Sequence, residues 1–220
     1  MIYSQADFEL AAITTDHTEQ IRLATHNDKC VVEALAENPS LCEAAQMTML
    51  GNRPTWKHIF ILASNEAIVE SAQKFIAEGG STRDRVWLAC NPSLVESVQK
   101  ILAKDSNTDV VVSLARNRSL TRAVQMILMH HKADVVRETL ALNKFACLEV
   151  RRVFATDYIS VREALASNRN IPNEIKDILA NDKSWIVSKT VRLHYRVIVD
   201  IKKLPRKYTP TKKAIYKIGL

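Results

Sequence analysis

Leu114-Ala115-Arg116-Asn117 is one copy of a Leu-Ala-x-Asn tetrapeptide that decides the fold of this 220-residue chain. The tetrapeptide occurs six times, and its asparagines are 27, 26, 26, 26 and 25 residues apart. These asparagines are Asn38, Asn65, Asn91, Asn117, Asn143 and Asn168. A fixed period of this length is typical of a repeat protein, in which each unit buries its apolar face against its neighbours. The sequence therefore predicts the architecture in detail and the function only in outline.

A second motif, apolar-Ala-x-Asp, lies about halfway between copies of the first and indicates that each unit has two similar halves. Its clearest copies end at Asp105, Asp157 and Asp182. The residues 3, 7 and 11 positions after each motif asparagine are apolar, which is the spacing of one face of an α-helix, and we expect position 10 to extend this stripe. In the preceding helix, Val135, Val136 and Leu140 illustrate the stripe. The predicted fold is an all-α, right-handed α-solenoid of about six to seven two-helix repeats with a period of about 26 residues.

The repeat also predicts how each unit turns between its helices. Asparagine is favoured in tight turns because its side chain bonds to nearby backbone groups, so we interpret the six asparagines as structural rather than as a row of ligand contacts. Ser40-Leu41-Cys42-Glu43 and Ser93-Leu94-Val95-Glu96 have the sequence of a capping box. They predict that the second helix of a unit begins at the serine.

Charge is unevenly distributed along the chain. Residues 1–110 hold 9 Lys/Arg against 15 Asp/Glu, residues 111–200 hold 15 against 9, and residues 201–220 hold seven against none. This asymmetry indicates an anionic partner at the C-terminal half or head-to-tail contact between copies. The four cysteines form no Cys-x-x-Cys pair, and residues 1–7 have no signal-peptide pattern, so we expect a reduced, cytoplasmic location and no membrane span.

The stretch from Val161 to Pro172, Val-Arg-Glu-Ala-Leu-Ala-Ser-Asn-Arg-Asn-Ile-Pro, followed by Ile178-Leu179-Ala180-Asn181-Asp182, resembles the variant leucine-rich repeat, an α-solenoid similar to HEAT repeats. The resemblance covers roughly residues 28–194 and implies shape rather than activity. The period here is longer than is usual in that family, its second proline occurs only at Pro172, and the cysteine cluster of one known member is absent. We expect a helical cap at 1–27, repeats at 28–194, and a helix end with a basic tail at 195–220.

No catalytic, cofactor-binding or metal-binding motif stands out in the sequence. Metalloprotease, nucleophile-elbow, phosphate-loop and dinucleotide signatures are missing, and the six histidines have no i, i+4 spacing. We therefore predict no enzyme activity, no cofactor and no small-molecule substrate. His130 and His131 fall where sister repeats place helix-capping residues.

A polar residue stands eight positions after each motif asparagine, and such a position projects as a line along one face of a helical repeat. The interpretations are a stack of glutamines that bond between units, or a groove that offers hydrogen bonds and positive charge to an acidic or nucleic-acid ligand. Trp87 is added as an anchor because sister repeats place smaller residues there. The candidate binding residues are Gln73, Gln99, Gln125, Arg118, Arg122, Arg151, Arg152, Lys176 and Trp87.

The tail is basic, with tyrosine and isoleucine interspersed among its charges. Three alternatives are a nucleic-acid arm, a peptide that docks on another protein, and a strap packed on the surface, of which we favour the strap. Its candidate contact residues are Lys202, Lys203, Arg206, Lys207, Lys212 and Lys213.

The first predicted function is a non-catalytic scaffold that binds a protein partner through the polar and basic face of its C-terminal half. The alternative is a nucleic-acid-binding, HEAT-like protein that contacts the phosphate backbone. An enzyme similar to DNA glycosylases is a distant third, because the similarity is one of architecture and no matching set of catalytic residues is present.

Overall fold

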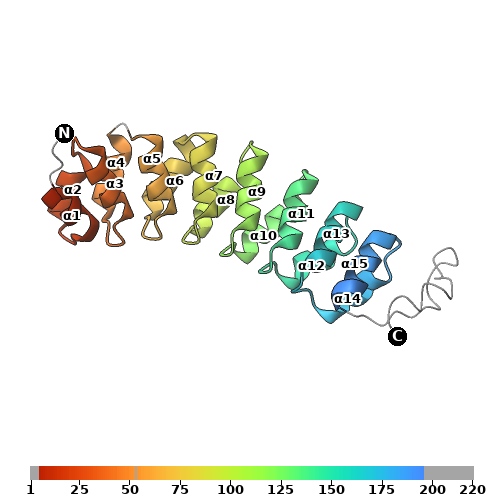
Figure 1. Ribbon diagram of the computed structural model, residues 1–220. Coiled ribbons are helices and arrows are strands. Elements are labelled where there is room, and N and C mark those ends of the chain that lie inside the picture. Colours follow the sequence, from red (N-terminus) through yellow and green to blue (C-terminus); the bar gives the residue numbers. More distant parts are fainter. Residues whose placement is uncertain (1–4, 53, 196–220) are drawn as a thin grey trace. The chain divides into compact units, whose positions relative to one another are not determined.

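A computed structural model describes residues 5–52 and 54–195, and within these ranges it contains fifteen α-helices and no strand (Figure 1). The all-α prediction is confirmed. The helices are α1 (Gln5–Ile13), α2 (His17–Ala24), α3 (Lys29–Glu37), α4 (Glu43–Gly51), α5 (Trp56–Ser64), α6 (Glu70–Gly79), α7 (Thr82–Cys90), α8 (Glu96–Leu102), α9 (Thr108–Arg116), α10 (Arg122–Leu128), α11 (Asp134–Leu142), α12 (Leu148–Phe154), α13 (Ile159–Ser167), α14 (Asn173–Ala180) and α15 (Trp185–Tyr195).

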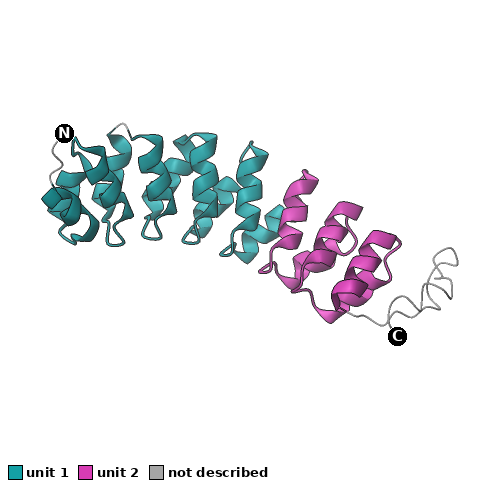
Figure 2. Cartoon of the chain, viewed as in Figure 1, with its two compact units in different colours: residues 1–128 teal, residues 129–220 magenta. Residues whose placement is uncertain are grey.

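The chain divides into two compact units, Met1–Leu128 and Met129–Leu220 (Figure 2). The division falls inside the range 28–194, which the sequence predicts to be one run of repeats. In unit 1 the odd-numbered helices α1 to α9 pack side by side, and the even-numbered helices α2 to α10 pack side by side next to them. In unit 2 α11, α13 and α15 are neighbours in the same way, and α14 packs against α15. This packing is consistent with a helical repeat.

The core is built from the positions that the sequence periodicity singled out. The residues 3, 7 and 11 positions after each motif asparagine are buried in every unit, from Leu41 to Leu179. Position 10 is different, because Phe75 and Ile178 there are 47 % and 49 % exposed. Val135, assigned to the stripe of the preceding helix, is 45 % exposed. These apolar residues lie at the edge of the buried stripe, each directly before one of its buried members. The prediction that they belong to the core is wrong.

Each of the six motif asparagines ends an odd-numbered helix, and side-chain bonds to the preceding repeat are seen for five of them. Asn91 is typical, because its Nδ2 donates to the carbonyl oxygens of Ala63 at 2.6 Å and Asn65 at 2.9 Å, while its Oδ1 accepts from the Ser93 amide at 2.7 Å. The same pattern of two donated bonds and one accepted bond recurs at Asn38, Asn65, Asn117 and Asn168. The structural interpretation of these asparagines is confirmed.

The aspartates of the second motif form ion pairs with buried or half-buried arginines 20 residues before them, and each arginine donates its Nε–H to the carboxylate. In the most buried example, Arg162 Nε lies 2.7 Å from Asp182 Oδ2, and the two side chains are 9 % and 7 % exposed. By sequence equivalence the residue at the Arg162 position is a buried valine, Val111, in one repeat, and the residue at the Asp182 position is His131 in the corresponding turn. The remaining pairs are Arg85 with Asp105 and Arg137 with Asp157.

His58 is a buried histidine that helps to begin α5. Its Nδ1 accepts from the Thr55 amide at 3.3 Å, and its own amide donates to Thr55 Oγ1 at 3.4 Å, which together form a capping box. Burial lowers the pKa of His58, and the nearby Glu33 carboxylate, itself bound to Lys57, opposes this effect only in part. Folding therefore favours the neutral imidazole.

The pH dependence of stability should follow from this histidine. The unfolded chain binds a proton at His58 near pH 6.5, whereas the folded chain does so only at lower pH, so the stabilisation is complete above about pH 6.5 and declines as the pH falls below it. Denaturant unfolding should show that the stability lost between about pH 7 and about pH 5 is smaller for His58→Gln than for the wild type. Glutamine keeps an acceptor at the capping position and does not titrate. His17→Gln, at an exposed site, is the control. An unchanged pH dependence in His58→Gln would contradict the assignment.

Candidate binding surfaces

The predicted glutamines lie in the interior, where they connect neighbouring repeats. Gln73 Nε2 donates to the carbonyl oxygens of Ile68 and Ser93, both at 3.0 Å, and its Oε1 accepts from the Val95 amide at 3.0 Å. Gln99 makes the equivalent three bonds, and Gln125 donates to the Leu120 carbonyl. All three glutamines are at most 4 % exposed. A ligand would have to displace these bonds to reach the amides, so this row supports the interpretation of a stack between units.

The backbone amide that donates a hydrogen bond to each of these glutamine oxygens belongs to the start of the next even-numbered helix. Val95 is the N-cap of α8 and Cys42 is the N-cap of α4, and neither has a capping bond from its own side chain. The predicted capping boxes are therefore wrong. The amides of Ser40 and Ser93 donate to the motif asparagines, and helix α4 begins only at Glu43. A glutamine of the preceding repeat supplies the capping bond, and the serine does not.

Arg151 occupies the glutamine position in unit 2 and is 7 % exposed. Its Nη1 donates to the Asn170 carbonyl, which is equivalent to the bond from Gln73 to Ser93, and its Nη2 donates at 2.8 Å to the Lys144 carbonyl, two residues before the position equivalent to Ile68. The residue that would supply an amide to an acceptor here is Pro172, the N-cap of α14, and proline has no N–H. A side chain with donors alone therefore fits this junction. Burial lowers the pKa of Arg151.

Three of the other basic candidates, of which Arg118 and Arg152 are exposed and Lys176 is half-buried, are engaged by acidic or aromatic neighbours. Arg152 Nε lies 2.9 Å from Glu174 Oε1, Arg118 lies 3.7 Å from Glu66, and Lys176 Nζ lies 4.4 Å from the centre of the Tyr195 ring. In unit 1, Lys74 and Lys100 pair with Glu70 and Glu96 and lower the pKa values of those carboxylates. Arg122, the first residue of α10, is exposed.

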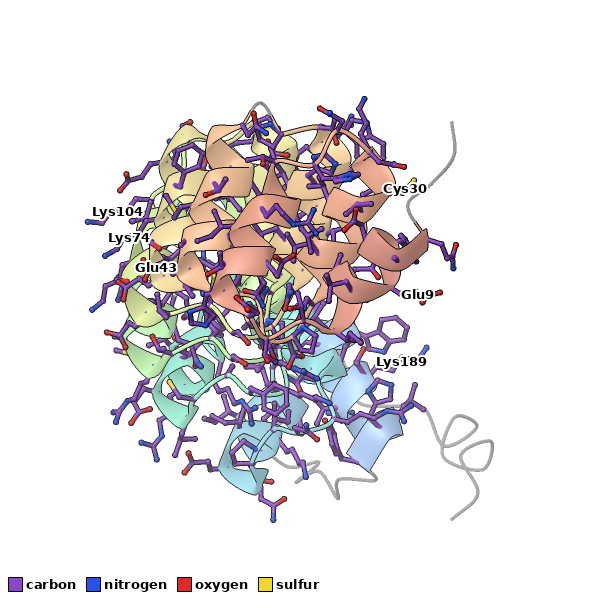
Figure 3. The ribbon with its side chains drawn as sticks, turned by 90° about the vertical axis from the view of Figure 1, so that its left-hand side faces the viewer. Glu9, Cys30, Glu43, Lys74, Lys104 and Lys189 are labelled. Atoms are coloured by element: carbon purple, nitrogen blue, oxygen red, sulfur yellow. The ribbon has the colours of Figure 1, made fainter. Side chains whose placement is uncertain are left out.

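Apolar side chains accompany these charges on the even-numbered helices. Phe75 on α6 and Ile178 on α14 are about half exposed, and Val153 on α12 is 38 % exposed. In unit 1, Figure 3 shows Glu43 of α4 and Lys74 of α6 on one side, with Cys30 of α3 on the opposite side. The face predicted to be polar and basic is thus mixed: charge-paired and partly apolar.

Trp87 lies in an aromatic cluster on the odd-numbered helices of unit 1. Its ring centre is 4.8 Å from that of Phe60 and 6.2 Å from that of Trp56, and the Arg83 guanidinium lies 6.0 Å from the Trp87 ring centre. Trp87 is half-buried among these side chains, whereas Trp56 is 61 % exposed. Much of the Trp87 surface therefore packs within the chain, and Trp56 offers more area to a partner.

An open groove of about 790 Å³ lies in unit 2 between the beginnings of α13 and α15. We call it the α13–α15 groove. Its apolar walls are Tyr158, Ile159, Trp185 and Ile186, which are 68 %, 48 %, 57 % and 50 % exposed. Its other lining residues are Thr156, Asp157, Arg162, Lys183 and Ser184.

The tail residues Lys202, Lys203, Arg206, Lys207, Lys212 and Lys213 lie outside the described residues. Within the described ranges no cluster of three or more His, Cys, Asp or Glu side chains could hold a metal ion, and no helix is long and apolar enough to cross a membrane. His131 Nδ1 accepts from the Ala133 amide at 3.1 Å, which is the turn-forming role expected for this position.

Comparison of the chain with protein-family models gave no match, and comparison with curated proteins gave none either.

Proposed function

We propose that the protein is a non-catalytic helical-repeat scaffold that binds a protein partner through its C-terminal half. The α13–α15 groove carries this proposal. Exposed aromatic residues are enriched where proteins bind proteins, because they supply large contact areas at small cost in side-chain entropy. Tyr158 and Trp185 line the groove from two different helices and are both more than half exposed.

The charge arrangement favours a protein over a polyanion as the partner. A nucleic-acid groove needs several cations free to neutralise phosphates. Here Arg151 is buried, and Arg152 and Arg118 have carboxylate partners. The alternative is a HEAT-like protein that contacts the phosphate backbone with this same face, and the basic sequence of residues 201–220 is what supports it.

We also propose that the helix pairs are about six to seven repeats of the variant leucine-rich type and belong to the class of right-handed α-solenoids. The recurrence of the same bonds between neighbouring repeats at Asn38, Asn65, Asn91, Asn117 and Asn168 supports this. A cytoplasmic location is part of the proposal, and it is supported by the four cysteines, all within the described residues, which form no disulfide.

Affinity capture with the intact chain as bait tests the proposed function. Lysate of the source cells is treated with nuclease and passed over the wild-type chain and over a Tyr158→Ala/Trp185→Ala variant. We expect one or more proteins to be retained by the wild type, lost by the variant, and bound directly after purification. Phe8→Ala/Trp56→Ala, which removes exposed aromatics from unit 1, is the matched control and should retain them. Retention that disappears with nuclease would favour the nucleic-acid alternative, and the absence of any directly binding protein would contradict the proposal.

A further inference from the structure

The α13–α15 groove combines two apolar pairs with a rim of positive charge. Tyr158 and Ile159 lie at the beginning of α13, and Trp185 and Ile186 lie at the beginning of α15. Each pair offers one ring and one branched aliphatic side chain to solvent. Such a recess is suited to a large aromatic or aliphatic side chain, which would contact both pairs at once and exclude water from them.

Cations already lie against the rings of this groove. The Lys189 ammonium is 4.3 Å from the centre of the Trp185 ring, and the Arg137 guanidinium is 5.7 Å from the centre of the Tyr158 ring. A cation over a ring face is attracted by the ring quadrupole, so each contact restrains its ring. The contacts also place positive charge directly beside the apolar walls.

The negative charge near the groove is already neutralised. Asp157, the carboxylate in its lining, is bound by Arg137 at 2.9 Å, and Asp182 is bound by Arg162 at 2.7 Å. Lys183 lines the groove and is exposed, and within the described residues no ion pair is found for it. Lys189 on α15 contacts the Trp185 ring and likewise has no ion pair within the described residues, so two ammonium groups accompany the apolar walls. Electrostatic complementarity therefore favours an anionic ligand.

Resting on the proposed function, we infer that the α13–α15 groove binds an acidic peptide segment with one large aromatic or aliphatic side chain. The anchor lies between Tyr158 and Trp185, and carboxylates flanking it pair with Lys183 and Lys189. Two unpaired ammonium groups suit a pair of carboxylates better than a polyphosphate backbone, which binds by contacts to many phosphates. The chain's own tail does not match this chemistry, because residues 201–220 carry seven Lys/Arg and no Asp/Glu.

The probes are fluorescein-labelled peptides with a central Trp, Leu or Ala flanked on both sides by Asp and Glu, and a matched set flanked by Lys. We expect the acidic Trp and Leu peptides to bind the intact chain with Kd values of about 1–100 μM, and the acidic Ala peptide and all Lys-flanked peptides to bind at least about tenfold more weakly. Trp185→Ala and Tyr158→Ala should each raise the Kd of the acidic Trp peptide by about tenfold or more. Lys183→Glu/Lys189→Glu should do the same, and the loss should be larger at low salt.

Two control variants match these changes in unit 1. Trp56→Ala removes an exposed tryptophan from the first position of α5, and Lys104→Glu reverses an exposed charge. Both should leave peptide affinity unchanged, and a far-UV circular dichroism spectrum should confirm that every variant keeps its helices. Equal losses in the controls, or no acidic peptide with a Kd below about 1 mM, would overturn the inference.

Two further measurements separate the inference from the proposed function. A short oligothymidylate that binds more tightly than any peptide, and loses affinity in Trp185→Ala, would assign the groove to nucleic acid instead. A captured protein that binds Lys183→Glu/Lys189→Glu as tightly as the wild type would overturn the inference and leave the scaffold function in place. Peptide binding without any captured protein would support the peptide site and contradict the scaffold function.

Discussion

Asp182→Ala should lower the free energy of unfolding by about 3–5 kcal/mol, the range found when one partner of a buried ion pair is removed. The variant leaves the Arg162 guanidinium in a site where its side chain is 9 % exposed. It also removes the acceptor for the Ser184 amide, which donates to Asp182 Oδ1 at 2.7 Å. Two-state fits of urea unfolding followed by circular dichroism would measure the loss. Asp177→Ala, an exposed carboxylate on α14, is the control and should change stability by less than about 0.5 kcal/mol.

The sequence of another repeat suggests a replacement for this ion pair. Val111 and His131 occupy the positions equivalent to Arg162 and Asp182, and His131 still accepts the turn amide. The double variant Arg162→Val/Asp182→His should therefore be more stable than Asp182→Ala, by about 1–3 kcal/mol of recovered stability, because no unpaired charge remains buried. If the double variant is the less stable of the two, the arginine is held by its other contacts, and the ion pair is not the source of the loss.

Asn117→Ala should cost about 3 kcal/mol, at the upper end of the range for a buried polar group that leaves its partners unsatisfied. Asn117 is 3 % exposed, and its side chain bonds to the carbonyl oxygens of Ala89 and Asn91 and to the Ser119 amide at 2.7–2.9 Å. Alanine would leave all three groups without this partner. The measurement is the same urea titration, supplemented by amide hydrogen exchange at Ser119.

Asn52→Ala provides the matched control for this prediction. Asn52 also follows a helix, as the C-cap of α4, but it is exposed. Its loss should change the free energy of unfolding by less than about 0.5 kcal/mol. Equal effects of the two substitutions would show that the contribution of Asn117 is only local turn propensity. A stable Asn117→Ala chain that has lost partner binding would reverse the structural assignment.

Most of the helical architecture could be predicted because the signals that define it are local and repeat. The Leu-Ala-x-Asn copies fixed where the odd-numbered helices end, and the apolar spacing after them fixed the buried stripe. The start of α4 was not predictable from its own sequence. Ser40 and Glu43 satisfy the capping-box pattern, but the bond that caps the helix comes from Gln20 in the preceding unit. A pattern within one helix does not contain a bond made between two units.

The candidate site was predicted less well, for a related reason. The glutamine position was recognised as special, but equivalence along the sequence does not distinguish a buried row from an exposed one, and Gln99 is fully buried. In the sequence, Trp185 is recognisable only as occupying the same repeat position as Trp56. Nothing in the sequence pairs Trp185 with Tyr158, because their proximity results from packing of α13 against α15. The signal available in the sequence was that aromatic residues stand at the beginnings of consecutive odd-numbered helices.

The bond from each glutamine to the next repeat also limits how such a chain can change in length during evolution. Loss of residues 66–91, one full period, would bring Gln46 opposite Ser93 and Val95, whose carbonyl and amide are the groups that Gln73 bonds now. The junction would remain satisfied. A recombination that placed the same glutamine before Pro172 would leave its oxygen without a donor. Duplication and deletion of repeats are therefore tolerated only between compatible neighbours, and Arg151 and Pro172 must be inherited together.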